Sequence, residues 1–230
     1  LRIRKKVAAF IIPSKFTVSK FIQFGVQPHK IFHIPTFFNS TNQNKALVSY
    51  ENFALYIGRV DQDKGLLTLV KAFENTNHSL VIAGGSSTKY DLLLKDYLKD
   101  KNHNIQFLGQ LDFAQIANYL SKCLFTVCPS EWYDNFPNTV LESFAYKKMV
   151  IASKLGSLTE LIQDNDNGLL FKVGDYLKLR DKVNLAFSDQ ENAVRMGNKK
   201  KKKIGTEYSP EKHYSSLLSV FNFVLNERNN

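Results

Sequence analysis

The stretch that decides the fold is PSEWYDNFPNTVLESFA, residues 129–145. It follows an apolar run, Leu124–Cys128, that is typical of a buried strand, and its Pro137 suits the first position of a helix. A parallel strand that feeds a helix through a short polar turn places the start of that helix at the carboxyl edge of a sheet. The free amides of Asn138 and Thr139 therefore predict an anion site at this helix start.

Two acids flank the helix start, Asp134 in the turn and Glu142 on the second helical turn. Both can reach a polar ligand that lies across the end of the helix. Each acid also has a purely structural interpretation, which the local pattern leaves open. Thr139 and Glu142 have the spacing of a capping box, in which Glu142 serves only the backbone, and Asp134 fits an ordinary turn residue.

Composition limits the class of protein. The chain has 230 residues, of which 43% are hydrophobic, and this is enough for one large domain and part of a second. Its longest apolar runs, such as Val7–Ile12, are far shorter than the roughly 20 residues that span a bilayer. Basic residues precede that run as in a signal peptide, but the run ends too early, at Pro13. We therefore expect a cytoplasmic protein.

The net charge of +10 indicates an anionic partner. Nucleic acid is one candidate, but the densest basic run, Lys199–Lys203, has no interleaved aromatic residues for base stacking. We interpret this run as a solvated helix end, with contact to anionic lipid headgroups as the alternative. No nucleic-acid partner is expected, and peripheral contact with the inner face of the membrane stays open.

Two cysteines, Cys123 and Cys128, are expected in one strand with their side chains on opposite faces. This placement excludes a disulfide or a shared metal between them. Both are interpreted as buried thiols of a reducing compartment.

Strand and helix patterns alternate along the chain, and a first unit is expected with strands at Val7–Ile12 and Lys30–Ile34 and a helix over 14–24. The polar segment Asn39–Lys45 is an expected linker. Strands of the main domain are expected at Phe53–Ile57, Leu80–Ala83, Ile105–Leu108, Leu124–Cys128, Met149–Ala152 and Gly168–Phe171. Helices are expected at Lys64–Glu74, Lys89–Asp100, Phe113–Ser121, from Pro137 onward and at Leu158–Gln163. This alternation predicts a doubly wound, Rossmann-like α/β fold with a parallel sheet covered by helices on both faces.

A second informative stretch is YIGRVDQDKGL, residues 56–66, in which a strand ends before Arg59 and a helix is expected to begin at the N-cap Asp63. Lys64 then places a cation in the first helical turn, and Gly65 adds a propensity cost of about 1 kcal/mol. A bound diphosphate would explain both, with Arg59 forking two phosphate oxygens and Lys64 acting as a point charge. A solvated surface pair remains the alternative.

Three other local patterns have simpler interpretations. Asp61 and Asp63 form a D-x-D pair, but the neighbouring cations disfavour a metal, and no metal site is expected. Gly84, after the second strand of the main domain, either lines the same crevice or only turns the chain. Ser157 and Glu160 have the spacing of a plain capping box.

Several motifs follow one another in order: GR at 58–59, KG at 64–65, IQFLGQL, PSEWYDNFPNTVLE, GSLTELI and DNDNGLLF. In this order and spacing they resemble the retaining glycosyltransferases of family 4, also called glycosyl transferases group 1, over about residues 7–175. The resemblance implies the GT-B architecture, in which two Rossmann-like domains enclose the active site. The implied division is a remnant of the acceptor domain at 1–38, a linker at 39–45, a nucleotide-sugar-binding domain at 46–208 and a C-terminal helix at 209–230 that crosses back.

The resemblance also implies a role for each site residue. Arg59 and Lys64 would bind the donor diphosphate, Asp134 the transferred sugar and Glu142 the nucleotide ribose, and these four form the expected catalytic set. No cofactor is implied, since the nucleotide diphosphate sugar, by family habit a UDP-sugar, is the donor substrate. Further substrate-binding positions are expected at Gly58, Gly84, Leu108, Leu111, Phe136, Asn138 and Thr139.

This sequence departs from the family pattern in several places. Asp134 stands where the family usually has Glu, so its shorter side chain changes the grip on the sugar. Pro137 replaces a frequent Gly and removes one amide donor, and Lys147 and Met149 stand where Gly and Pro are common. The family's N-terminal glycine loop and its His near the reacting carbon have no counterpart, and a fragment or truncated copy is expected.

The implied reaction is transfer of a sugar to an acceptor hydroxyl of a saccharide or lipid-linked saccharide, with retention at the anomeric carbon. Two alternatives stay open: a donor-binding module without turnover, and a basic nucleic-acid-binding protein, which would show a steep salt dependence. The C-terminal helix also carries an apolar stripe, and without a partner domain this stripe should stay partly exposed and cause self-association. The stripe consists of Tyr214, Leu217, Leu218, Phe221, Val224 and Leu225.

Overall fold

The computed structural model describes residues 6–38, 50–86, 88–199 and 205–228. Its main body is a six-stranded sheet in the order β5-β4-β3-β6-β7-β8, in which every neighbouring pair is parallel. The strands are β3 (Phe53–Ile57), β4 (Ser79–Ala83), β5 (Asn104–Gly109), β6 (Phe125–Cys128), β7 (Met149–Ser153) and β8 (Gly168–Phe171). The predicted doubly wound α/β fold is confirmed.

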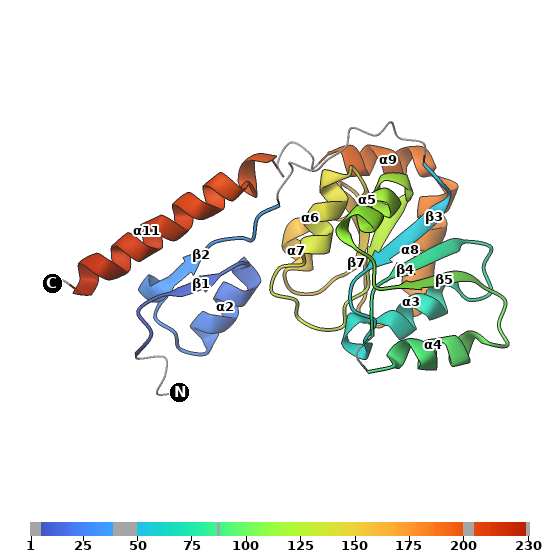
Figure 1. Ribbon diagram of the computed structural model, residues 1–230, viewed down its shortest axis with the longest axis horizontal. Helices are drawn as coiled ribbons and strands as arrows, with labels where there is room; N and C mark the ends of the chain where they lie inside the picture. The colour runs from blue at the N-terminus through green and yellow to red at the C-terminus, as the bar shows by residue number, and fades with distance from the viewer. Residues whose placement is uncertain (1–5, 39–49, 87, 200–204, 229–230) are drawn as a thin grey trace.

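Helices cover both faces of this sheet (Figure 1). One face carries α3 (Leu66–Phe73), α4 (Tyr90–Leu98), α8 (Tyr176–Ser188) and α9 (Gln190–Asn198). The other face carries α5 (Phe113–Lys122), α6 (Asn138–Ala145) and α7 (Leu158–Leu161). Neighbouring residues of β3 serve different faces, since Ala54 belongs to the first core and Leu55 to the second. Because both faces are buried, the strand is continuously apolar.

The strand order reverses between β3 and β6, which pair with each other although β4 and β5 come between them in the chain. The two halves of the sheet therefore diverge from this pair. The loops that follow β3 and β6 start side by side at the carboxyl edge of the sheet, where doubly wound folds bind ligands. This reversal decides where a site can form.

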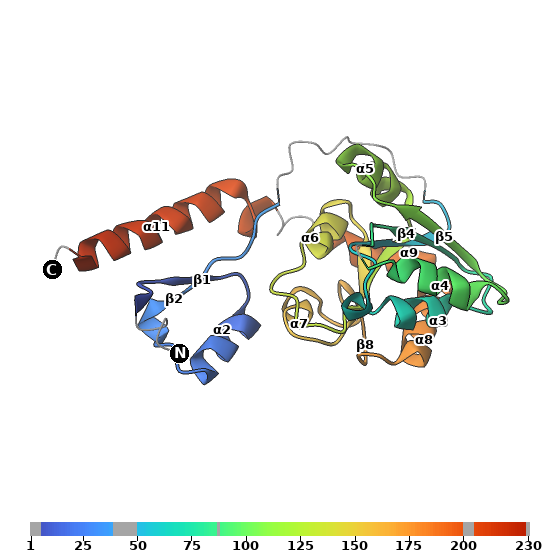
Figure 2. The same cartoon turned by 60° about the horizontal axis from the view of Figure 1, so that its bottom comes forward.

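A small unit stands beside the main body, on the side of α6 and α7 (Figures 1 and 2). Its strands β1 (Phe10–Ile12) and β2 (Ile31–His33) pair in parallel and are joined through α2 (Lys15–Gln23) and the short 3₁₀ turn η1 (Pro28–Lys30). Ser14 caps α2, because its Oγ accepts a hydrogen bond from the Thr17 amide at 3.1 Å. The predicted strand-helix-strand pattern of this unit is confirmed, with shorter strands than expected.

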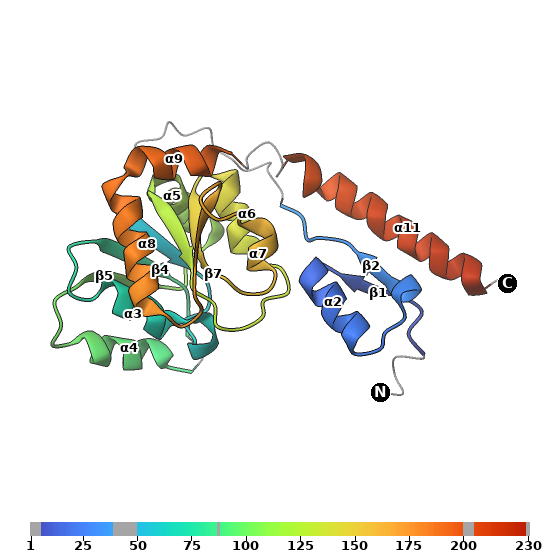
Figure 3. The same ribbon diagram turned by 180° about the vertical axis from the view of Figure 1, so that it is seen from behind.

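The last helix, α11 (Pro210–Arg228), lies along β2 rather than on the main sheet (Figures 1 and 3). The rings of Phe32 and Phe223 pack edge to face with centroids 5.2 Å apart. Ser209 caps this helix, because its Oγ accepts a hydrogen bond from the Lys212 amide at 3.2 Å.

The apolar stripe of α11 is only partly covered. Leu217 and Val224 are half-buried, whereas Tyr214 and Phe221 are 64% and 56% exposed. Leu218 and Leu225 are also exposed. The partly exposed stripe agrees with the sequence prediction, and self-association through it stays a prediction.

The start of the helix after β3 was predicted wrongly. Residues Gln62–Lys64 form a separate 3₁₀ turn, η3, and α3 begins only at Leu66. Asp63 is therefore not an N-cap, and Lys64 does not lie in the first turn of an α-helix. Gly65 joins the two turns with a φ of 69°, in the left-handed region. A Cβ at this position would lie 2.0 Å from the carbonyl oxygen of Pro129.

The two cysteines are placed differently from the prediction. Cys123 caps the end of α5 and precedes β6, so the pair does not share a strand. Cys123 is buried, Cys128 is half-buried, and both are free thiols. Burial raises the pKa of each thiol to about 12, so both remain protonated at neutral pH.

Two sequence predictions fall on residues outside the described ranges, and a third concerns the absence of a membrane-spanning helix. The expected linker, Asn39–Lys45, lies outside the described residues, as does most of the basic run Lys199–Lys203. Within the described ranges, no helix is both long and apolar enough to cross a bilayer.

Replacing Gly65 by Ala should lower the free energy of unfolding by roughly 2 to 4 kcal/mol, from the left-handed backbone and the overlap with Pro129. Gly109→Ala is the matched control, because Gly109 has nearly the same φ, 70°, and no atom within 4 Å of the added Cβ. Urea unfolding of both variants isolates the contact with Pro129. Equal losses in the two variants would contradict this account.

Candidate functional site

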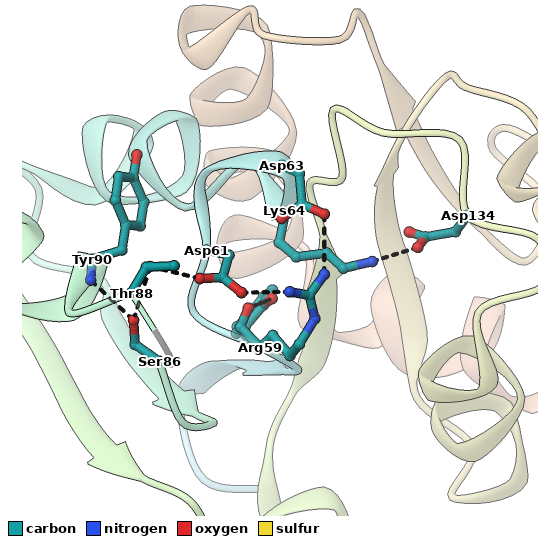
Figure 4. A network of polar contacts seen from close by, with 9 residues as sticks. Arg59, Asp61, Asp63, Lys64, Ser86, Thr88, Tyr90 and Asp134 are labelled. Carbon is teal, nitrogen blue, oxygen red and sulfur yellow. Dashed lines mark hydrogen bonds and ion pairs between the residues drawn. The ribbon is translucent and has the colours of Figure 1, made fainter.

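The candidate site lies at the carboxyl edge of the sheet, where the segments after β3, β4 and β6 meet (Figure 4). Arg59 follows β3, and its guanidinium pairs with Asp61 at 2.5 Å and Asp63 at 3.1 Å. The Arg59 side chain is 61% exposed, whereas that of Asp61 is 9% exposed. A buried acid thus fixes the position of the Arg59 guanidinium, which stays accessible to solvent.

Asp61 belongs to a wider network. Its second carboxylate oxygen accepts a hydrogen bond from Thr88 Oγ1 at 2.8 Å, which ties the β3 loop to the β4 loop. The sequence suggested a D-x-D pair for Asp61 and Asp63 and a helix N-cap for Asp63, whereas both carboxylates contact Arg59. Within the described ranges, no three His, Cys, Asp or Glu residues gather in a way that could hold a metal. Asp61 is therefore a positioning residue that the sequence patterns did not single out.

Lys64 and Asp134, predicted separately for the site, are brought together as an ion pair between Nζ and Oδ1. The other oxygen, Oδ2, accepts a hydrogen bond from Ser130 Oγ at 2.7 Å. Both charged side chains are about one-fifth exposed, at 21% and 19%. A cation and an acid from opposite sides of the strand reversal therefore form one partly buried unit that still reaches solvent.

Two glycines allow the backbone segments after β3 and β4 to approach each other closely at the site. A Cβ on Gly84 would lie 1.7 Å from the carbonyl oxygen of Gly58, so only glycine fits at this approach. Gly58, Arg59, Gly84 and Leu111 together line a pocket of about 430 Å³. These four predicted residues are thus brought together at one pocket.

Two other predicted residues lie in packing positions. Leu108 packs against the core under α5 and is not among the residues that line the pocket. Phe136 packs under α6, and its ring lies 5.7 Å from that of Tyr208, centroid to centroid. The structure gives each a role in the core around the site.

The start of α6 differs in detail from the prediction. Pro137 is the N-cap rather than the first helical residue, and no side chain caps the helix. The alternative interpretation of Thr139 and Glu142 as a capping box therefore does not hold. The first amides of α6, those of Asn138 and Thr139, have no partner within the helix. Thr36 of the small unit donates a hydrogen bond to Asn138 Oδ1 at 2.8 Å.

Glu142 is half-buried on α6, and desolvation by this burial raises the pKa of its carboxyl above its usual value of 4.5. The ionised form of Glu142 therefore lowers the stability of the folded protein, because burial removes water from the carboxylate. A partly buried acid with a raised pKa is a common feature of binding and catalytic sites.

The second predicted capping box, at Ser157 and Glu160, is also absent. Short-range turn bonds satisfy the first amides of α7, including that of Glu160, which donates to the Ser157 carbonyl at 3.1 Å. Both side chains are therefore free for long-range contacts. Ser157 Oγ donates to the Asp134 carbonyl at 2.7 Å, and the Glu160 carboxylate accepts from the amides of Lys15 and Phe16.

Replacing Glu142 by Gln should raise the free energy of unfolding at neutral pH, because the neutral amide avoids the desolvation of the carboxylate. Since the pKa is raised in the folded state, wild-type stability falls as pH rises through that pKa. The advantage of the variant should therefore be largest near about pH 8 and shrink toward about pH 5 in urea titrations. Glu191→Gln on α9 is the exposed control, and a pH-independent advantage of Glu142→Gln would contradict this account.

The family model of the glycosyl transferases group 1 matches residues 38–203. A glycosyltransferase of Methanocaldococcus jannaschii, itself uncharacterized, is 27% identical over 170 residues, which cover 74% of this chain and 48% of that protein. An N-acetylgalactosaminyltransferase of Campylobacter jejuni, named for a diphospho-undecaprenol-linked saccharide, is 27% identical over 66% of this chain and 43% of its own. The chain spans about half the length of these relatives.

Among solved structures, Anabaena HepE in complex with UDP and glucose superposes with a TM-score of 0.85. It covers 94% of this chain and 63% of its own, at 17% sequence identity. At this identity the likeness concerns the fold alone, and the fold is of the GT-B type.

Proposed function

We propose, since this chain belongs to the glycosyl transferases of group 1, that it binds a UDP-sugar and transfers the sugar to an acceptor hydroxyl with retention at the anomeric carbon. The predicted group 1 family is confirmed. Its narrower assignment to family 4, the retaining chemistry and the UDP carrier belong to the proposal. The proposed acceptor is a saccharide or lipid-linked saccharide of polysaccharide or glycolipid synthesis.

The observation that carries this proposal is the convergence of Arg59, Lys64 and the start of α6 at the strand reversal. Negative charge accumulates on the departing diphosphate as its bond to the sugar breaks. Two cations and free helix amides that are already oriented stabilise this charge without reorganisation. The proposed reaction therefore needs no metal and no cofactor, and the nucleotide diphosphate sugar enters it as a substrate.

Asp134 and Glu142 are assigned different roles in the proposal. Asp134 is paired with Lys64, next to the proposed diphosphate, and is assigned the sugar. Glu142 is assigned the ribose, and its ionised form would accept hydrogen bonds from the sugar hydroxyls. The pocket between Gly84 and Leu111 is assigned the base.

In the proposed organisation, residues 46–208 bind the donor. Residues 1–38 and the helix at 209–230 belong to the acceptor side. A cytoplasmic location with peripheral contact at the inner membrane face fits a lipid-linked acceptor and the charge of +10.

A donor-binding module without turnover is the competing function, and the exposed Tyr214 and Phe221 on α11 favour it. A thermal-shift panel of nucleoside diphosphates and their sugars, followed by a transfer assay, separates the two. Stabilisation by nucleic acid alone would contradict both.

Arg59→Ala and Lys64→Ala should each weaken UDP binding by roughly 1.5 to 3 kcal/mol, the range for hydrogen bonds to charged groups. Isothermal titration calorimetry measures the loss. Lys178→Ala is the control, because Lys178 is an exposed cation that pairs with Asp181 on α8 and does not line the site pocket. Unchanged UDP affinity in both site variants would remove the diphosphate from this site.

The two acids should separate in their effects on binding. Glu142→Gln should weaken binding of UDP itself, since the ribose belongs to the nucleotide. Asp134→Asn should leave UDP affinity unchanged and remove only the additional affinity for the sugar-bearing donor. Titrations of both variants with UDP and with a UDP-sugar make the comparison, and identical behaviour would contradict the division of roles.

A further inference from the structure

The first turn of α2 is capped from a distant part of the chain. The amides of Lys15 and Phe16 donate to the two carboxylate oxygens of Glu160 at 3.0 and 2.5 Å. Ser14 Oγ accepts the next amide, that of Thr17. The free donors at the start of α2 are thus shared between a local cap and an acid on α7, whose negative charge also faces the positive end of the helix.

An aromatic contact lies beside this cap. The ring of Phe16 packs on that of Tyr133, with centroids 4.8 Å apart. Gly156 makes room for the pair, because a Cβ there would lie 3.1 Å from Tyr133 and 3.3 Å from Phe16. The small unit therefore contacts the loop after β6 directly.

Both contacts involve residues that lie next to Asp134 in the chain or bond to its backbone. Tyr133 precedes it in the chain, and Ser157, three residues before Glu160, donates to its carbonyl oxygen at 2.7 Å. The short helix α7 thus binds the small unit with one side chain and the backbone of Asp134 with another. Ser157 itself is 1% exposed, so this end of α7 is fixed in the core.

The loop needs such support, because its residues between β6 and α6 are largely exposed. Trp132 and Tyr133 are 63% and 55% exposed, and Glu131 and Asn135 are exposed as well. Glu131 is bonded to Thr68, the Asp134 carboxylate is bonded to Ser130 and Lys64, and Tyr133 packs on Phe16 of the small unit. The position of the Asp134 carboxylate therefore depends on its direct partners and on the groups that contact its neighbours.

We propose that Glu160 is a positioning residue for sugar transfer: by capping α2 it couples the seating of the small unit to the conformation of the loop that carries Asp134. When the cap is made, Phe16 is held on Tyr133 and Asp134 is held beside Lys64. When the cap is broken, the contact of Phe16 with Tyr133 loses this anchor, while the bonds of the loop to Ser157, Lys64 and Thr68 remain. The role in transfer rests on the proposed function, whereas the coupling itself does not.

The single tryptophan of the chain makes the loop observable, because Trp132 lies two residues from Asp134. The variants are Glu160→Ala, which removes both acceptors, and Phe16→Ala, which removes the ring contact. Glu191→Ala on α9 is the control for loss of an acid in the first turn of a helix. Three measurements are made on the 230-residue chain: amide hydrogen exchange, acrylamide quenching of Trp132, and titration with UDP and with UDP-glucose.

In Glu160→Ala, exchange should accelerate roughly tenfold both in the first turn of α2 and across the loop at 131–136. Quenching of Trp132 should increase, and Glu160→Gln, which keeps one acceptor, should give intermediate values. UDP affinity should be unchanged, while the additional affinity for UDP-glucose should fall. Phe16→Ala should reproduce the loop effects with less change at the start of α2.

Faster exchange in α2 with an unchanged loop and unchanged quenching would show that Glu160 is only a helix cap, and would overturn the proposal. An equal loss of affinity for UDP and UDP-glucose would do the same, because it would indicate general destabilisation. If the unaltered chain binds no nucleotide, the proposed function fails, and exchange and quenching still decide whether the coupling exists.

Discussion

The approach of Gly65 to the carbonyl of Pro129 is the constraint on which the candidate site depends. These two residues belong to the segments after β3 and β6, which the strand reversal sets side by side. Lys64 precedes the glycine, and Asp134 lies a few residues beyond the proline. The ion pair between them can form only because no side chain separates the two backbones.

Each cation of the site is paired with an acid and remains partly exposed to solvent. A buried cation without a partner is costly, and a fully solvated one has no fixed position. Arg59 and Lys64 avoid both extremes, because Asp61 and Asp134 hold them at one side while the other side stays open. A guanidinium has five N–H donors, so its two acid contacts leave donors for a further anion. The network is thus oriented in advance for a ligand with concentrated negative charge.

The helix α7 shows how a local pattern can be overridden by the fold. Ser157 and Glu160 have the residues and the spacing of a capping box, yet the turn carbonyls already satisfy the amides that such a box would serve. Their side chains are then available to Asp134 and to α2, which the topology brings within reach. In contrast, Asp112 and Gln115 form a complete capping box at the start of α5, where no distant partner competes.

The amino-acid sequence by itself determined the alternation of strands and helices, because this pattern depends on residues within a few positions of one another. It also indicated the family, through motifs that follow one another in a fixed order along the chain. It also identified Arg59, Lys64 and Asp134 as candidates. Only the tertiary structure decided that Lys64 pairs with Asp134, that Asp61 holds Arg59 and that Glu160 reaches Lys15, which is 145 residues away. Such contacts depend on which loops the strand order places together, and no local spacing encodes that order.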